Sequence, residues 1–139
     1  MQITGQCHCG AISMSAYVDP SRVVVCHCSD CQVLSGAPMR AMLPVPAEHV
    51  ELTGSPRHYV KRTGNHKWHA HAFCSRCGTQ LYACDAESPS IYNLRLGWIN
   101  ERDQLPPMLQ IWTRSAMPWL HELDALPACD KGVHDPCRV

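Results

Sequence analysis

Short stretches of alternating or β-branched apolar residues recur along this chain, separated by turn-forming residues. Residues 67–73 alternate between polar and apolar side chains, and residues 22–25 form the kind of β-branched run that is typical of a buried strand. Glycine and proline stand between most of these stretches. The predicted strands are residues 2–6, 11–18, 22–25, 39–45, 49–52, 58–62, 67–73, 80–84, 90–96 and 109–113.

Two of these pairs of strands are predicted to be joined by short turns. Residues 2–6 and 11–18 should form a hairpin, since Gly10 permits a tight turn between them. The strands at residues 49–52 and 58–62 should be joined at Gly54-Ser55-Pro56.

One helix and two helical turns complete the predicted elements. Ser29 is the predicted N-cap of a helix that runs through Ser35 and ends at Gly36. Residues 100–104 and 118–123 are expected to form short helical turns. The pattern predicts an all-β fold, in one domain over residues 1–127 and a loosely held C-terminal tail over residues 128–139.

Composition indicates that the apolar core alone is small. The chain of 139 residues contains one phenylalanine, eleven prolines and eight glycines. A structural metal would help such a domain to hold together, because a closed zinc site contributes on the order of 10 kcal/mol of apparent folding free energy.

Charge and hydropathy narrow the classes of partner. The net charge is zero, with 12 basic and 12 acidic residues, which argues against a general nucleic-acid binder. The longest basic cluster, residues 57–67, is interpreted as the solvated face of a hairpin. No secretory signal and no membrane span is expected, which predicts a cytoplasmic protein. In that reducing compartment, the ten cysteines are better interpreted as metal ligands or catalytic groups than as disulfides.

Seven of the cysteines fall into three short clusters, and these carry the candidate chemistry. The clusters are Cys7 with Cys9, then Cys26, Cys28 and Cys31, then Cys74 with Cys77. The Cys74 pair, followed by Gly78, is the most specific, because it matches half of a zinc knuckle. Seven sulfurs divide into four, which would close a tetrahedral site, and three, which would leave zinc an open position.

Spacing alone leaves the assignment of the clusters open. It does not decide which pairs join, and two sulfurs of the central cluster could instead complete one zinc site while the third is a buried thiol. Cys31 is expected in the first turn of the predicted helix, where the helix dipole favours the thiolate.

A zinc ion with three thiolates and an open position suits thiol chemistry. A substrate thiol bound there would be deprotonated and could add to an aldehyde carbon, or leave in the reverse step. Hydrolysis ranks lower, because three anionic sulfurs make zinc a poor Lewis acid.

Other reactive or bulky side chains have simpler interpretations. Among the histidines, His27, His69 and His71 are the candidates for ligation or proton transfer, and His27 has the best position. Arg40 and Arg62 could neutralise a substrate carboxylate, although a solvated arginine is the simpler interpretation. Cys84 is expected to be a small buried residue. The remaining residues singled out are the core or cleft-wall candidates Trp68, Trp98, Trp112 and Trp119, and the tail thiols Cys129 and Cys137, expected to be free and oxidisable.

The order of the motifs resembles a known family. Cys7-His8-Cys9-Gly10, Cys26-His27-Cys28-Ser29-Asp30-Cys31 and Phe73-Cys74-Ser75-Arg76-Cys77-Gly78-Thr79 are similar to those of the glutathione-dependent formaldehyde-activating enzymes, whose domain the centromere protein V group shares. The resemblance extends from Gly5 to Trp119. It implies a β-tent zinc fold and condensation of formaldehyde with glutathione to S-hydroxymethylglutathione.

The resemblance also implies roles for the seven cysteines and a count of metals. Cys7, Cys9, Cys74 and Cys77 would hold a structural zinc, and Cys26, Cys28 and Cys31 a catalytic zinc, giving two Zn²⁺ per chain.

Two hypotheses about function follow. The first is a zinc-dependent carbon–sulfur lyase that acts on a small-molecule thiol adduct, with glutathione as the candidate thiol and neither nucleic acid nor a membrane as partner. The alternative is a non-catalytic, zinc-stabilised binding module. The oligomeric state stays open.

Overall fold

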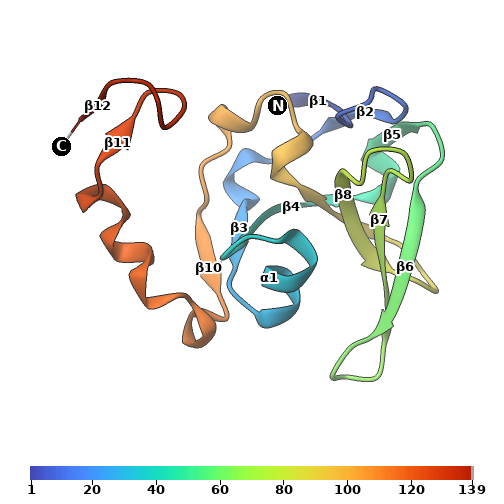
Figure 1. The fold of residues 1–139 in the computed structure, drawn as a ribbon. Coiled ribbons are helices and arrows are strands. Elements are labelled where there is room, and N and C mark those ends of the chain that lie inside the picture. Colours follow the sequence, from blue (N-terminus) through green and yellow to red (C-terminus); the bar gives the residue numbers. More distant parts are fainter. Residues whose placement is uncertain (139) are drawn as a thin grey trace.

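The computed structural model of the protein describes residues 1–138 and is mainly β, with a few short helices (Figure 1). Ten strands build two sheets, and two short strands pair near the C-terminus. The strands are β1 (Gln2–Gln6), β2 (Ser13–Tyr17), β3 (Val24–Cys26), β4 (Arg40–Pro46), β5 (Val50–Thr53), β6 (Arg57–Arg62), β7 (Trp68–Phe73), β8 (Gln80–Asp85), β9 (Ile91–Arg95), β10 (Leu109–Ile111), β11 (Ala128–Cys129) and β12 (Cys137–Arg138).

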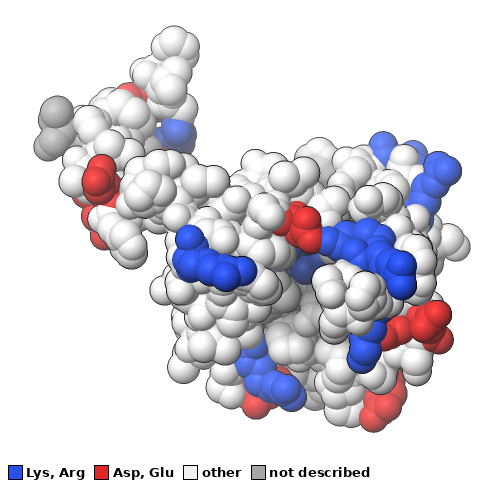
Figure 2. Space-filling model, turned by 90° about the horizontal axis from the view of Figure 1, so that it is seen from below, with Lys and Arg blue, Asp and Glu red and all other residues white. Residues whose placement is uncertain are grey.

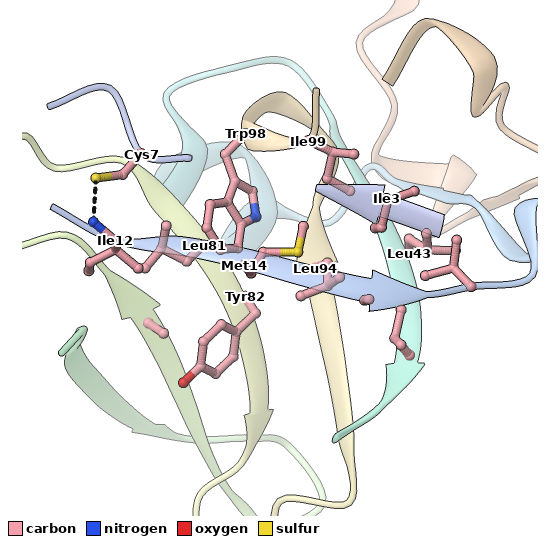
Figure 3. Packing of buried hydrophobic residues seen from close by; sticks show 14 of the residues in the cluster. Ile3, Cys7, Ile12, Met14, Leu43, Leu81, Tyr82, Leu94, Trp98 and Ile99 are labelled. Atoms are coloured by element: carbon pink, nitrogen blue, oxygen red, sulfur yellow. Dashed lines mark hydrogen bonds between the residues drawn. The ribbon is translucent and has the colours of Figure 1, made fainter. Parts of the chain in front are cut away.

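The smaller sheet has the order β1-β2-β5, and the larger sheet has the order β10-β3-β4-β9-β8-β7-β6. All neighbouring strands are antiparallel except β10 and β3, which are parallel. The hydrophobic core includes side chains from both sheets (Figure 3). Ile3 and Met14 come from the smaller sheet, and Leu43 and Leu94, which are paired across β4 and β9, come from the larger one.

The other face of the larger sheet carries polar side chains, and we call it the site face. Residues directly opposite each other in a sheet point to the same side, as do residues two apart on one strand. Cys26 lies opposite Arg40, and Met42 lies opposite Arg95. Farther along, His71 of β7 lies opposite Tyr59 of β6. The site face is therefore defined by Cys26, Arg40, Met42, Arg95, His71, Tyr59 and Lys61.

The single α-helix of the described residues lies at this face. Helix α1 (Ser29–Ser35) follows β3 directly, and Asp30 in its first turn forms an ion pair with Lys61 of β6. The predicted helix and its end at Gly36, which is left-handed, are confirmed. The predicted N-cap is wrong, because Cys28 caps the helix and its Sγ accepts the N–H of Cys31.

Six 3₁₀ helices make most of the remaining connections. They are η1 (Pro20–Arg22), η2 (Ala47–His49), η3 (Leu96–Trp98), η4 (Arg102–Gln104), η5 (Thr113–Ser115) and η6 (Pro118–Ala125). In the described part of the chain, no helix is both long enough and apolar enough to cross a membrane. On the face that Figure 2 shows, basic and acidic side chains lie next to each other in several small groups.

The predicted connection at Gly54-Ser55-Pro56 is confirmed, since it joins β5 to β6. The two strands pair with other partners: β5 adds to β2, with Leu52 opposite Met14, and β6 pairs with β7. The partner of β5 is therefore decided by the burial of Leu52 against the core, and not by the turn that connects β5 to β6.

The tail is more ordered than predicted. Strands β11 and β12 form an antiparallel pair in which Cys129 lies opposite Cys137, and the two are joined in a disulfide. The expectation of two free thiols is wrong, because this cross-strand register brings the sulfurs together. Of the predicted tail, residue 139 lies outside the described residues.

Candidate metal centres

Four cysteine sulfurs from two distant parts of the chain meet in one group, which we call the four-cysteine cluster. Cys7 and Cys9 come from the turn between β1 and β2, and Cys74 and Cys77 from the turn between β7 and β8. The Sγ of Cys9 lies 3.7 Å from those of Cys7 and Cys74. All four sulfurs lie within 4.8 Å of one another.

The two turns that carry these sulfurs share one backbone design. Gly10 and Gly78 have φ angles of 81° and 75°, a left-handed conformation that glycine adopts without strain. Each donates its N–H to the carbonyl of the first cysteine of its pair, at 2.9 Å for Cys7 and 2.8 Å for Cys74. The glycine that follows each pair thus folds the chain back and points both sulfurs the same way.

Hydrogen bonds from outside the cluster reach two of its four sulfurs, those of Cys7 and Cys77. The N–H of Ile12 donates to Cys7 Sγ at 3.2 Å (Figure 3). Thr79 Oγ1 lies 3.1 Å from Cys77 Sγ and accepts the N–H of His8 at 3.1 Å. Hydrogen bonds from the hydroxyl and the backbone of Thr79 lower the pKa of Cys77 to about 5. A thiolate at this position is therefore favoured before any cation arrives.

The other three sulfurs form the three-cysteine cluster. Cys26 ends β3, Cys28 caps α1, and Cys31 lies in the first turn of α1. Their sulfurs lie within 4.8 Å of one another. Cys26 is buried, whereas Cys28 and Cys31 are only partly buried. The cluster is thus anchored at one end and reachable at the other.

The helix dipole does not dominate the protonation of Cys31. Burial, together with the neighbouring thiols of Cys26 and Cys28, raises the pKa of Cys31 to about 12. Three thiols so close together cannot all ionise unless a cation joins them, so binding a metal here releases protons.

The donor sets of both clusters fit a soft metal ion. Zinc bound by thiolates has Zn–S distances of about 2.3 Å, and tetrahedral geometry then places the sulfurs about 3.8 Å apart. The 3.7 Å separations in the four-cysteine cluster match this spacing. Either cluster could hold a metal ion, the first with four ligands and the second with three.

Two buried arginines stand beside the three-cysteine cluster on the site face. Arg40 and Arg95 are 4% and 6% exposed. Burial, and then repulsion from Arg40, lowers the pKa of Arg95 to about 9, while the thiols of Cys31 and Cys26 act in the opposite direction. Both guanidinium groups therefore carry positive charge at neutral pH.

His71 completes the polar part of this face. Burial, followed by the positive charges of Arg95 and Arg40, lowers the pKa of His71 to about 4, so the imidazole is neutral near pH 7. Its Nδ1 lies 3.3 Å from Nη2 of Arg95, which can only donate. The ring hydrogen is therefore on Nε2, which has no hydrogen-bond partner among the described residues.

Comparison with known proteins places the chain in a family. Residues 2–115 match the sequence profile described as "Glutathione-dependent formaldehyde-activating enzyme". This match spans well over half of the chain. The chain belongs to this family. The family description points to a glutathione-related activating role, and all seven cluster cysteines lie within the matched residues.

Two individual proteins are similar to this member of the family. A protein of Schizosaccharomyces pombe named an uncharacterized lyase is 28% identical over 78 residues, which are 56% of this chain and 54% of that protein. This chain therefore matches about half the length of that relative. The crystal structure of a Rhodobacter sphaeroides protein aligns with a TM-score of 0.57 and 19% identity, covering 77% of this chain and 98% of the other. That likeness supports the fold.

The structure gives the other predicted residues of this family member different positions. His27 is buried, and its Nε2 lies 2.8 Å from Gln110 Oε1 of β10. It also lines a cavity of about 330 Å³. Among the described residues, neither His27 nor His69 places a ring nitrogen in either cysteine cluster. Cys84 is buried in the core, as predicted.

Of the arginines and tryptophans singled out in the sequence, some are buried and others are exposed. The solvated interpretation is wrong for Arg40, which is buried, while the Arg62 guanidinium lies 5.9 Å from the ring of the exposed Trp68. Trp98 is in the core, as predicted. Trp112 and Trp119 are exposed.

Two contributors to the site were not anticipated from the sequence. Thr79 is two residues after Cys77, so the knuckle motif could have predicted that its hydroxyl lies beside the Cys77 sulfur. Arg95 had a weaker signal. Strand alternation places it on the face away from Leu94, but an arginine on such a face is ordinarily solvated.

Proposed function

We propose that this protein is a zinc-dependent carbon–sulfur lyase that acts on the adduct of a small thiol with an aldehyde, of the glutathione and formaldehyde type. The observation that carries the proposal is the unequal division of the sulfurs. Four cysteines supply every ligand of a tetrahedral ion, whereas three leave one position for a substrate.

In this proposal the seven cysteines have distinct roles. Cys7, Cys9, Cys74 and Cys77 hold a structural zinc that ties the two knuckles into a β-tent fold over residues 1–127. Cys26, Cys28 and Cys31 hold the second zinc at the catalytic centre. Zinc there would stabilise the thiolate of a thiol substrate, which makes it both a better nucleophile and a better leaving group at neutral pH.

The reaction balances with few groups. In the synthetic direction the substrate sulfur forms a bond to the aldehyde carbon, and the thiol proton ends on the new hydroxyl oxygen. In the lyase direction the same bond breaks and the proton returns to sulfur. The Nε2–H of His71 is buried and has no acceptor among the described residues, and in this proposal it would donate a hydrogen bond to the oxygen that gains charge. A cytoplasmic location would supply glutathione.

A titration of cobalt-substituted protein tests this function. Glutathione should change the sulfur-to-cobalt charge-transfer bands, and S-methylglutathione, which lacks the thiol, should not. A Cys28→Ser variant should lose the response, because one ligand of the three-cysteine cluster is gone. If no small thiol alters the spectrum, the protein is better described as a zinc-stabilised binding module.

Formation of the product tests the chemistry itself. Proton NMR of a mixture of glutathione and formaldehyde should show faster exchange between free thiol and S-hydroxymethyl adduct with the wild-type protein than with the Cys28→Ser variant. Equal rates for the two proteins would reject catalysis at this cluster.

A further inference from the structure

Among the described residues, the groups of opposite charge that act on the buried cations Arg40 and Arg95 are the thiols of the three-cysteine cluster. Both Nη atoms of Arg40 and the Nε of Arg95 are buried and have no hydrogen-bond partner among the described residues. The remaining nitrogens of Arg95 face His71 Nδ1 at 3.3 Å and Met42 Sδ at 4.0 Å, and neither atom is charged. Buried charges are normally paired, so this pair of guanidinium groups is unusual.

Among the described residues, no buried carboxylate is present to pair with these arginines. The buried polar side chains of residues 1–137 are His27, Arg40, His71 and Arg95, and none of them is acidic. Asp30, which lies between Cys28 and Cys31 in the sequence, forms its ion pair with Lys61. The two arginines therefore leave hydrogen-bond donors that the oxygen atoms of a ligand could accept.

The arginines lie on the same face as the three-cysteine cluster. Arg40 is directly opposite Cys26 in the β3–β4 pair, which places their Cβ atoms about 5 Å apart. Arg95 is opposite Met42, two residues from Arg40 on β4, so the same face continues to it. An anion held by both guanidinium groups would thus lie next to whatever occupies the cluster.

Charge points to an anion as well. Three thiolates and one divalent ion carry a net charge of −1, and the two guanidinium groups carry +2, so this part of the protein has an excess of positive charge before substrate binds. Guanidinium groups present paired N–H donors that match the two oxygens of a carboxylate.

We infer that Arg40 and Arg95 form a carboxylate subsite beside the three-cysteine cluster, where they would hold a carboxylate of the thiol substrate. The subsite itself depends only on the positions of the two arginines. The assignment of the ligand as a thiol rests on the proposed function.

Isothermal titration of the zinc-loaded protein with two matched pairs of small molecules separates these claims. Propionate and propionamide share their shape but differ in charge, as do 3-mercaptopropionate and 3-mercaptopropionamide. We expect each carboxylate to bind about tenfold or more tightly than its amide, the gain from charge-assisted hydrogen bonds. Arg40→Met and Arg95→Met should abolish this preference, while Arg22→Met, which removes an exposed arginine of η1 that is not one of the site-face residues, should keep it.

The outcomes distinguish the subsite from the thiol chemistry. Equal binding of propionate and propionamide, or a preference that survives in both methionine variants, overturns the carboxylate subsite even if the thiols bind. If propionate shows the preference but 3-mercaptopropionate binds no more tightly than propionate, the subsite is supported and the proposed thiol function fails.

Discussion

The two cysteine clusters use the same side chain in different surroundings. Cys7 and Cys74 of the four-cysteine cluster are part of the hydrophobic core, whereas Cys9 is exposed. The Sγ of Cys7 is hydrogen-bonded to Ile12, and that of Cys77 to Thr79. Only Cys26 of the three-cysteine cluster is buried, and two buried cations stand on the same face. The first cluster offers four sulfurs to a metal ion, whereas the second offers three and lies beside two cations.

This contrast shows how a protein can assign different roles to chemically identical ligands. Four thiolates within hydrogen bonds and apolar packing favour a closed, inert site. Three thiolates beside uncompensated positive charge favour an anionic exogenous ligand. Each of the following changes tests one side of the contrast, from the largest expected effect to the smallest.

Cys74→Ser should abolish the stable fold. Loss of a closed zinc site removes on the order of 10 kcal/mol of apparent folding free energy, as much as a typical domain has. Urea unfolding followed by circular dichroism should show no cooperative transition. Cys84→Ser is the matched control, since it places a hydroxyl at a buried cysteine outside both clusters and should cost only about 1–3 kcal/mol. Similar losses in the two variants would contradict a structural metal at the four-cysteine cluster.

Cys28→Ser should leave the protein folded but with one metal fewer per chain. A ligand present at a thousand times its Kd stabilises by about 4 kcal/mol, and we expect a loss of this order. Elemental analysis of reduced protein, with two zinc ions per chain in the wild type and one in the variant, is the measurement. An unchanged zinc content would reject the three-cysteine cluster as a second site.

Arg95→Met should stabilise the ligand-free protein. Replacing a buried charge that lacks a partner with an apolar side chain of similar length is expected to raise the free energy of unfolding by about 1–4 kcal/mol. Arg95→Lys keeps the charge and should bring no such gain. Thermal unfolding in buffer without carboxylates measures both, and a lower melting temperature for the methionine variant would show that Arg95 has a structural role.

His71 should make the stability depend on pH. Its pKa falls from 6.5 to about 4 on folding, so between these values the unfolded chain binds more protons and acid favours unfolding. The wild type should therefore lose about 1 kcal/mol more than His71→Asn between pH 7 and pH 5.5. Urea unfolding at the two pH values measures the difference, and parallel losses in the two proteins would disprove a depressed pKa.

Local patterns in the sequence predicted much of the secondary structure because each depends on a few adjacent residues. Strand β1 has the predicted bounds, and helix α1 ends at Gly36 as predicted. The knuckle turns at Gly10 and Gly78 were readable because a left-handed residue after a cysteine pair favours glycine.

Long-range pairing and burial were harder to read. The connection between β5 and β6 was predicted, but the sequence did not reveal that β5 pairs with β2, with Leu52 opposite Met14, while β6 pairs with β7 in the other sheet. The burial of Arg40 and Arg95 was not predicted, because no local sequence pattern distinguishes a buried arginine on a strand from one that is exposed to solvent. The disulfide between Cys129 and Cys137 depends on a strand register that the sequence of the tail does not reveal.

The separation of the ligands along the chain has a consequence for how the protein matures. The three-cysteine set is complete within six consecutive residues, so a nascent polypeptide can chelate an ion there soon after residue 31 leaves the ribosome. The pairing of Cys9 with Cys74 spans 65 residues and needs a long loop to close first. We expect two kinetic phases when zinc is added to the unfolded apoprotein. The fast phase should be lost in Cys28→Ser and the slow phase in Cys74→Ser. Stopped-flow fluorescence of Trp98, in a variant without the other tryptophans, would resolve the slow phase.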